Sequence, residues 1–401
     1  MNFDILISGA GPAGLCLARA LSGHGLRIAL VEQQPLAALE QPAFDGREIA
    51  LTQHSAQLMR QLGLWERIEA FAPNALSPLR DARILNGASP FAMVIGHGLT
   101  AHSELGWLVS NHLIRRAAYE SVQAAMQANG DITLLAGEAV SRVGSDAQGA
   151  QVTLASGAVL DARLLVAADS RFSTTRRAMG IAADMHDFGQ TMLVCVMAHE
   201  APHHHAAWEW FDYGQTLALL PMNDDPATGA HRSSVVLTLT HHAIERLLAL
   251  EAGVFNQNLA RRFAGRLGAM TLASTRHAYP LVAVYPRRMV AQRFACVGDA
   301  AVGMHPVTAH GFNFGLLGVE ALAQGVLAAH AAGRDMASAE MLERYEQRHR
   351  RATRPTYLAT QFITGLYTHD SLPARALRDM ALRVGERLMP FKRALAASLT
   401  A

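Results

Sequence analysis

Three glycines near the start of the chain have the spacing of a dinucleotide-binding turn. The segment Gly9-Ala10-Gly11-Pro12-Ala13-Gly14 follows the apolar run Ile5-Leu6-Ile7. In such a turn, one glycine permits the bend from strand to helix, one lets the backbone approach a pyrophosphate and one allows close helix packing. Glu32 ends a second apolar run, where a carboxylate can bond the ribose hydroxyls of an adenosine. The spacing predicts a strand–helix–strand unit that binds a dinucleotide, either FAD or NAD.

Two later strand ends favour FAD. Asp169 follows the apolar run 164–168, and Gly298-Asp299 follows the run 294–297. An aspartate at the end of a strand can bond a ribityl or ribose hydroxyl. A helix that begins near Gly311 directs free amides and the positive end of its dipole toward an electron-rich ring edge. The N1–C2=O edge of a flavin meets that requirement.

The chain resembles the single-component flavin aromatic hydroxylases, and within them the hydroxylases of ubiquinone biosynthesis. The motifs above carry this resemblance together with Arg47 in Gly46-Arg47-Glu48-Ile49-Ala50-Leu51, and it continues through Gly63-Leu64-Trp65 and Tyr279-Pro280-Leu281 to Leu342-Glu343-Arg344-Tyr345-Glu346. The resemblance implies contacts to FAD from Gly9, Gly11, Pro12, Ala13, Gly14, Glu32, Arg47, Asn111, Asp169, Asp299, Pro306, Gly311, Phe312 and Asn313.

The same resemblance implies a reaction. FAD is reduced by NADH or NADPH, the reduced flavin takes up molecular oxygen, and a flavin C4a-hydroperoxide transfers a hydroxyl group to an activated phenol ring. The implied substrate is a polyprenylated intermediate of ubiquinone biosynthesis. The sequence has no second glycine fingerprint for the nicotinamide, which is therefore expected to dock transiently. His310 and His305 are weak candidates for holding a phenolate or relaying a proton, and packing roles are open for both.

Four positions in three motifs depart from the family pattern. Ser170 stands where the family has glycine, Val302 where it has histidine, and Ala309-His310 where it has Gly-Gln. These changes leave two alternatives open: a hydroxylase of another, soluble aromatic substrate, or a non-catalytic FAD-binding subunit of a biosynthetic assembly. Flavin halogenation is disfavoured, because Trp208-Glu209-Trp210 is followed by Phe-Asp and the only lysine is Lys392, in the tail.

The expected fold is α/β, with a Rossmann-like FAD-binding domain, an inserted antiparallel β-sheet that binds substrate, and a helical C-terminal region. The FAD-binding domain is predicted to comprise residues 1–75, 100–180 and 276–330, and the sheet domain residues 76–99 and 181–275. The helical region is predicted over 331–401, with Pro355, Pro373 and Pro390 dividing it into short helices. The resemblance assigns the lining of the substrate pocket to Phe211, Leu219 and Pro221.

Composition excludes several other classes of protein. The net charge of +2 argues against nucleic-acid binding, and three isolated cysteines argue against a disulfide framework. The histidines at 199, 203–205, 241 and 242 have no metal-ligand spacing, so no metal is expected. The sequence predicts neither a signal peptide nor a membrane span, and hence a cytoplasmic enzyme.

The C-terminal region differs in charge from the rest of the chain. Residues 341–401 carry eleven basic and five acidic side chains, with apolar residues at helical spacing. Helices docked on the core explain this pattern. A basic, amphipathic surface that meets anionic lipid at the inner face of the membrane, or a partner in a biosynthetic complex, explains it as well.

Overall fold

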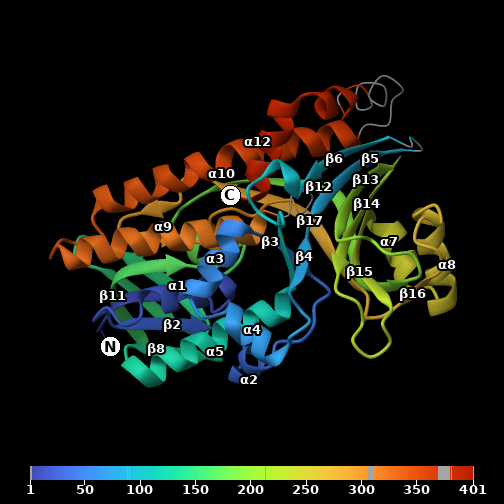
Figure 1. The fold of residues 1–401 in the computed structure, drawn as a ribbon. Helices are drawn as coiled ribbons and strands as arrows, with labels where there is room; N and C mark the ends of the chain where they lie inside the picture. Colours follow the sequence, from blue (N-terminus) through green and yellow to red (C-terminus); the bar gives the residue numbers. More distant parts are fainter. Residues whose placement is uncertain are drawn as a thin grey trace.

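The computed structural model describes residues 2–87, 89, 91–212, 214–305, 310–368, 380 and 382–400. In this part of the chain, the strands form three sheets, and long helices pack along one of them (Figure 1). The predicted α/β class, with a nucleotide-binding sheet and a second large sheet, is confirmed.

The nucleotide-binding sheet has a parallel core in the order β8-β2-β1-β11-β19. Ile5, Leu6 and Ile7 at its centre are fully buried, as expected for parallel strands covered on both faces. The strands of the core and of its antiparallel extensions are β1 (Asn2–Ser8), β2 (Ile28–Glu32), β8 (Ile132–Ala136), β9 (Val140–Ser145), β10 (Ala150–Leu154), β11 (Val159–Ala167), β18 (Val290–Ala291) and β19 (Phe294–Cys296).

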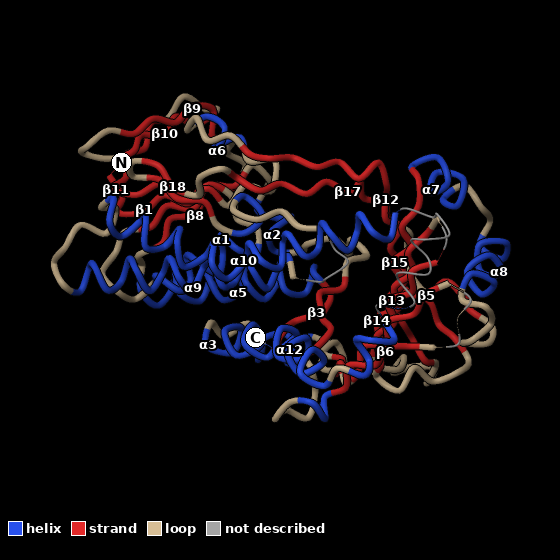
Figure 2. The backbone as a smooth tube through the Cα atoms, turned by 90° about the horizontal axis from the view of Figure 1, so that it is seen from above, coloured by secondary structure: helices blue, strands red, loops and turns tan. Residues whose placement is uncertain are grey.

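Helices α1, α5, α9 and α10 pack beside one another along this sheet (Figure 2). Helix α9 is long and apolar enough to span a membrane, but most of it is buried against α1 and α10, as in the core helix of a globular domain. The helices of this part are α1 (Pro12–Leu21), α2 (Leu36–Glu40), α3 (Gln53–Gln61), α4 (Trp65–Phe71), α5 (Asn111–Asn129), α6 (Thr174–Ala178), η2 (Gly298–Ala300), α9 (Gly311–Ala331) and α10 (Ala339–Thr368).

The large sheet has the order β16-β12-β15-β14-β13-β5-β6, and β17 also pairs with β12. It is antiparallel except for the parallel pair β13 and β5. Figure 2 shows β12 and β17 running from the nucleotide-binding part into this sheet. Its strands are β5 (Asp81–Asn86), β6 (Ala92–Gly96), β12 (Ala183–His199), β13 (Ala206–Asp212), β14 (Gln215–Met222), β15 (His231–Thr240), β16 (Met270–Leu272) and β17 (His277–Pro286).

The two faces of the large sheet pack against different parts of the chain. Its outer face, which includes Trp210 and Leu217, forms a core with Phe255 and its neighbours on α7 (His241–Leu248) and α8 (Ala252–Arg262). Its inner face approaches the nucleotide-binding part, because a Cβ on Gly46 would lie 2.8 Å from Val194 of β12. At β5 and β6, this inner face is covered by α12 (Met389–Thr400).

A small sheet of β3 (Glu48–Thr52), β7 (Gly106–Ser110) and β4 (Ser77–Leu79) lies between the two larger sheets (Figure 1). Its strands β4 and β7 contact β14 of the large sheet. A short 3-10 helix, η1 (His97–Leu99), follows β6 and contacts α12.

The prediction that Pro355 ends a helix is wrong, because α10 continues through it from Ala339 to Thr368. A proline inside a helix removes one hydrogen bond and costs about 3 kcal/mol. Tertiary contacts on both sides of the proline oppose this cost. Thr353 lies 3.3 Å from the hydroxyl of Tyr285, and the ring of Tyr357 packs on the same tyrosine. Pro373 lies outside the described residues, and Pro390 lies in the first turn of α12, where proline is favourable.

Candidate active site

Four parallel strands of the nucleotide-binding sheet bring the predicted cofactor residues to one edge. Strands β1, β2, β11 and β19 are neighbours and run in the same direction. Gly9, Glu32, Asp169 and Asp299 lie at or just beyond their carboxyl ends. Ligands of open α/β sheets bind at this edge. Residues separated by up to 290 positions in sequence thus form one site.

The three fingerprint glycines have distinct surroundings. Gly9 has a φ of +107°, and a Cβ there would lie 2.5 Å from the carbonyl oxygen of Ala168. A Cβ on Gly14 would lie 2.0 Å from the carbonyl oxygen of Gly9. A Cβ on Gly11 would meet nothing within 4 Å. Gly9 and Gly14 are therefore needed for the fold of the turn, while Gly11 leaves the backbone open to a ligand.

The first turn of α1 provides donors for phosphate. Gly11 caps the helix without a side-chain hydrogen bond, Pro12 occupies the start, and the first turn contains no acidic residue. Ala13 contacts the second motif of the site, since a Cβ on Gly298 would lie 2.6 Å from the Cβ of Ala13. The free amides and the helix dipole favour an anion at this end.

Two backbone amides fix the carboxylate of Glu32. The N–H of Ala10 donates to Oε2 at 2.7 Å, and the N–H of Gln34 donates to Oε1 at 2.9 Å. The side chain thus joins the end of β2 to the glycine turn. Each carboxylate oxygen can accept a further hydrogen bond, as the ribose prediction requires.

Arg47 and Asn111 meet at a residue that the sequence reasoning missed. The guanidinium of Arg47 lies 2.6 Å from Asp45 Oδ2, and the amide of Asn111 donates to the same oxygen at 2.7 Å. Burial alone would raise the pKa of Asp45, but the hydrogen bonds and the charge of Arg47 outweigh it and lower the pKa. Asp45 therefore holds two predicted FAD contacts, Arg47 and Asn111, in one place. Asp45 directly precedes the Gly46-Arg47 motif, and this adjacency could have identified it from the sequence.

The two predicted aspartates have different partners. Asp169 accepts from the first turn of α6, namely from Thr174 Oγ1 and the N–H of Thr175, and from Oγ of Ser173, the N-cap of that helix. Asp299 forms an ion pair with Arg171, whose Nη2 lies 2.9 Å away. The role of Arg171 was not evident from the sequence, since the two residues are 128 positions apart.

Ser170 keeps the backbone conformation for which the family uses glycine. Its φ is +96°, in the region that side chains other than glycine rarely occupy. The departure from the family pattern at this position is therefore accommodated with backbone strain. Val302, the second departure, is 1% exposed and packs in the core of the nucleotide-binding part.

The first turn of α9 docks on β3. Asn313 Oδ1 accepts from the N–H of Thr52 at 3.1 Å, and its Nδ2 donates to the carbonyl of Ala50 at 2.8 Å. A Cβ on Gly311 would meet nothing within 4 Å, and the first turn has no acidic residue. Phe312 packs against the core beneath. The helix thus presents an open, electropositive end, while Asn313 anchors it.

The two candidate histidines are both buried. His305 packs edge-on against the ring of Phe188, and burial, with the nearby charge of Arg171, lowers its pKa to about 4. The imidazole is therefore neutral at pH 7. His310 precedes α9, with its ring 5.3 Å from that of Phe314. Pro306, a predicted cofactor contact, and Ala309 lie outside the described residues.

The three predicted substrate residues do not share a face of the large sheet. Leu219 lies in the core of the outer face, under α7 and α8. Phe211 follows Trp210 of that core in β13 and therefore projects to the inner face. Pro221 lies two positions after Leu219 in β14, so it shares the parity of the outer face. Only Phe211 of the three projects toward the nucleotide-binding part.

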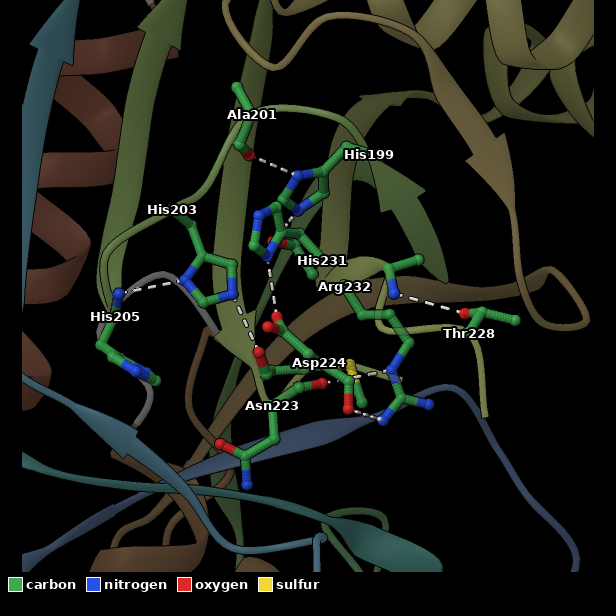
Figure 3. Close-up of polar contacts among 12 residues, drawn as sticks. His199, Ala201, His203, His205, Asn223, Asp224, Thr228, His231 and Arg232 are labelled. Atoms are coloured by element: carbon green, nitrogen blue, oxygen red, sulfur yellow. Dashed lines mark hydrogen bonds and ion pairs between the residues drawn. The ribbon is translucent and has the colours of Figure 1, made fainter. Parts of the chain in front are cut away.

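A group of histidines gathers at one end of the large sheet (Figure 3). Nδ1 of His199 lies 2.8 Å from the carbonyl of Ala201, and Nε2 of His203 lies 2.8 Å from the carbonyl of Met222. The N–H of His205 donates to the other nitrogen of His203, whose pKa is lowered by burial to about 4. Burial also lowers the pKa of His199, against the effect of its hydrogen bond to Ala201, so both rings are neutral at pH 7. Among the described residues, no three metal-ligating side chains are grouped to hold an ion.

Comparisons with known proteins agree with this arrangement. A family model described as an FAD binding domain matches residues 2–358. The chain is 42% identical to Ubiquinone hydroxylase UbiM of Neisseria meningitidis, over 100% of this chain and 85% of that protein. It is 33% identical to Ubiquinone hydroxylase UbiL of Rhodospirillum rubrum, over 97% of this chain and 87% of that protein. The chain belongs to the FAD-dependent aromatic hydroxylases.

Solved structures show the same fold for this hydroxylase. p-Nitrophenol 4-monooxygenase from Pseudomonas putida superposes with a TM-score of 0.76 at 17% identity, over 100% of this chain and 99% of that chain. A variant of HpxO from Klebsiella pneumoniae, crystallised with FAD, superposes with a TM-score of 0.72 at 20% identity, over 99% and 98%.

The residues of the hydroxylase fit FAD. Gly9 and Gly14 close the turn and Gly11 leaves it open, as a pyrophosphate requires. The strand ends would supply acceptors for the adenosine and ribityl hydroxyls, and α9 would present free amides to the ring system. FAD is the cofactor of this enzyme, and NADH or NADPH is its reductant. The match to the family model and the identity to ubiquinone hydroxylases assign it to the monooxygenases.

Proposed function

We propose that the enzyme hydroxylates the ring of a prenylated phenol in ubiquinone biosynthesis. The observation that carries this proposal is the 42% identity to a protein named as a ubiquinone hydroxylase, maintained over the whole of this chain. The prenylated ring and molecular oxygen would meet on the inner face of the large sheet. This face approaches Gly46, which precedes the predicted cofactor residue Arg47.

The protein's own side chains bind and orient the cofactor, and they exclude water from the site. The strand-end carboxylates and the first turns of α1 and α9 hold the cofactor, which when bound supplies electron transfer from the nicotinamide and the activation of oxygen. The fixed dipole of α9 stabilises negative charge at its open end without reorganising. The neutral His305 and the ring of Phe188 close one side of the site with little polar surface. This limits the access of water to the reaction.

Lipid analysis of a strain that lacks the protein tests the proposal. We expect a prenylated ring precursor short of one oxygen to accumulate and the ubiquinone pool to fall, with both reversed by reintroducing the gene. In a strain without a redundant hydroxylase, an unchanged quinone pool would contradict the proposal. It would instead favour a soluble aromatic substrate.

We also propose that the C-terminal region docks on the cytoplasmic surface of an anionic membrane. Several large apolar side chains are exposed there, namely Leu358, Phe362, Met380, Val384, Leu388, Met389 and Phe391, with exposed fractions between 44% and 73%. Arg383, Arg387 and Arg393 lie within the same segment. Apolar side chains flanked by basic ones favour an anionic lipid surface, and a polyprenyl chain would reach the enzyme from the bilayer.

Vesicle sedimentation tests this second proposal. We expect the enzyme to sediment with vesicles that contain phosphatidylglycerol and to remain in solution with neutral phosphatidylcholine. Replacing both Phe362 and Phe391 by serine should lower the bound fraction at least tenfold, since each buries apolar area at the lipid interface. Replacing Phe172 by serine provides a control outside the C-terminal surface, because Phe172 is 45% exposed on the loop before α6. Equal recovery in solution with both vesicle types would contradict membrane docking.

A further inference from the structure

One carboxyl group on the inner face of the large sheet has no hydrogen-bond or ion-pair partner among the described residues. Glu209 stands in β13 between Trp208 and Trp210, which both belong to the core of the outer face. Since successive residues of a strand project to opposite faces, Glu209 projects to the inner face. Its lateral neighbours there are Ile84 of β5 and Ala218 of β14.

Nothing in the described chain compensates this carboxyl. Among the described residues, neither a hydrogen bond nor an ion pair reaches it, and burial is the one influence on its pKa, which rises to about 8. The side chain is half-buried, and a carboxyl that loses part of its water without gaining a partner costs free energy that an apolar side chain would not. Such groups in folded proteins call for an explanation other than packing.

The surroundings of Glu209 are those of a substrate pocket. The same face carries Phe211, two positions later in β13. At Val194 of β12, this face contacts Gly46, which precedes the predicted cofactor residue Arg47. On its other side, Ile84 packs with Met93 and Ile95 against α12. Glu209 is thus an ionisable group between the apolar Ile84 and Ala218, on the wall between the cofactor edge and the C-terminal helix.

We propose that Glu209 binds a hydroxyl group of the substrate ring and accepts its proton. This inference rests on the proposed function. The phenolic O–H bond breaks, an O–H bond forms on a carboxylate oxygen of Glu209, and the electron pair stays on the ring oxygen. The ring becomes more electron-rich, and the proton returns to the ring oxygen when the product leaves.

The protonation behaviour of the side chain suits this step. A phenol has a pKa near 10 and an ordinary glutamate one near 4.3. A carboxyl whose pKa lies near 8 is closer to the phenol, so the transfer costs less. The hydrogen bond also fixes which ring carbon faces the cofactor, which makes Glu209 a determinant of regiospecificity.

Two variants separate this role from a structural one. Glu209→Gln keeps the shape but cannot accept the proton, and Glu209→Leu removes the polar atoms. We expect both to slow product formation at least about 100-fold, the usual contribution of a general base. We expect Glu209→Leu to melt at the same temperature as the parent or higher, because it removes an unpaired polar group. Glu245→Gln, on the exposed surface of α7, is the control and should leave both quantities unchanged.

Ligand binding gives a readout independent of turnover. Titration calorimetry on the FAD-loaded protein would compare a geranylated phenol with its methyl ether. Above pH 8, where Glu209 is a carboxylate, the parent enzyme should bind the phenol about 10–100-fold more tightly, as expected for a hydrogen bond to a charged group, and Glu209→Leu should bind the two equally.

Each result decides the proposal. If Glu209→Leu still prefers the phenol, or forms product at the parent rate, the proposal is overturned. A lower melting temperature with equal weakening toward both ligands would also overturn it, because it would show a structural role. If the parent enzyme binds the phenol selectively through Glu209 but hydroxylates no prenylated phenol, the proposed function fails while the binding role stands.

Discussion

The buried guanidinium of Arg176 donates a hydrogen bond to the carbonyl oxygen of Ala300 at 3.1 Å. The same Nη1 lies 3.2 Å from the carbonyl of Arg171. These two carbonyls belong to the segments that carry Asp169 and Asp299. Arg176 is 2% exposed, so the hydrogen bonds are shielded from water. Arg176 therefore joins the two acidic strand ends of the cofactor site, in addition to the ion pair of Arg171 with Asp299.

Replacing Arg176 by methionine should separate these two segments. Two buried carbonyls would lose their donor, which predicts a loss of about 2–4 kcal/mol in the free energy of unfolding and at least a tenfold weaker affinity for FAD. Urea denaturation and flavin titration measure the two effects. Arg177→Met is the matched control, because the neighbouring arginine is exposed. Equal FAD affinity in both variants would show that Arg176 does not organise the site.

Replacing Ser170 by glycine should stabilise the protein. The φ of +96° strains a serine but not a glycine, and such strain costs about 1–3 kcal/mol, partly offset by the greater backbone entropy of glycine in the unfolded chain. We expect a net gain of about 0.5–1 kcal/mol in urea denaturation, with the activity retained. Ser170→Ala keeps the strain and should gain nothing. A less stable glycine variant would mean that the serine hydroxyl matters more than its backbone.

Replacing Asn313 by aspartate should detach the first turn of α9 from β3. The amide donates to Ala50 and accepts from Thr52, whereas a carboxylate would face the carbonyl of Ala50 without a proton to donate. The variant should lose about 1–3 kcal/mol of stability and show a changed flavin absorption spectrum. An unaltered spectrum together with full stability would contradict an anchoring role for this asparagine.

His349 should make stability depend on pH. Its ring is 1% exposed, packs against Tyr345 and Gly318, and has a pKa lowered by burial to about 4. The unfolded chain, with a histidine pKa near 6.5, binds the proton first. The contribution of His349 is therefore complete above pH 6.5 and is lost as the pH falls toward 4, by about 1.4 kcal/mol per pH unit.

The variant His349→Leu isolates this contribution. The difference in unfolding free energy between the parent and the variant should change with that slope between pH 6.5 and 4, and be constant above pH 7. Measuring the difference cancels the opposite effects of Glu48 and Glu209, whose pKa values are raised by burial to about 8. Parallel stability curves over the whole range would exclude a buried neutral His349.

The parts of the site that were predictable from sequence depend on local geometry. Gly9, Gly11 and Gly14 act within one turn, and Glu32 follows the next strand, so their spacing alone indicates the unit. The cysteines Cys16, Cys195 and Cys296 are free, in line with the predicted lack of a disulfide framework, and burial raises the pKa of the Cys16 thiol to about 12.

The remaining features depend on which segments meet in space. The pairing of Arg171 with Asp299 crosses 128 positions and leaves no periodic signal. The face of Leu219 depends on α7 and α8 covering the outer side of the sheet, which strand alternation alone does not reveal. Pro355 was predicted to end a helix because its local cost is visible in sequence, while the packing of Thr353 and Tyr357 on Tyr285 is not.

The most direct measurement is oxygen-isotope incorporation by the FAD-loaded enzyme. The purified protein would be supplied with NADPH or NADH, a short-chain prenylated phenol and ¹⁸O₂, and the product analysed by mass spectrometry. The account predicts one ¹⁸O atom in each ring product and about one nicotinamide oxidised per product formed. Nicotinamide oxidation that yields only hydrogen peroxide, or no oxidation stimulated by the phenol, would contradict it.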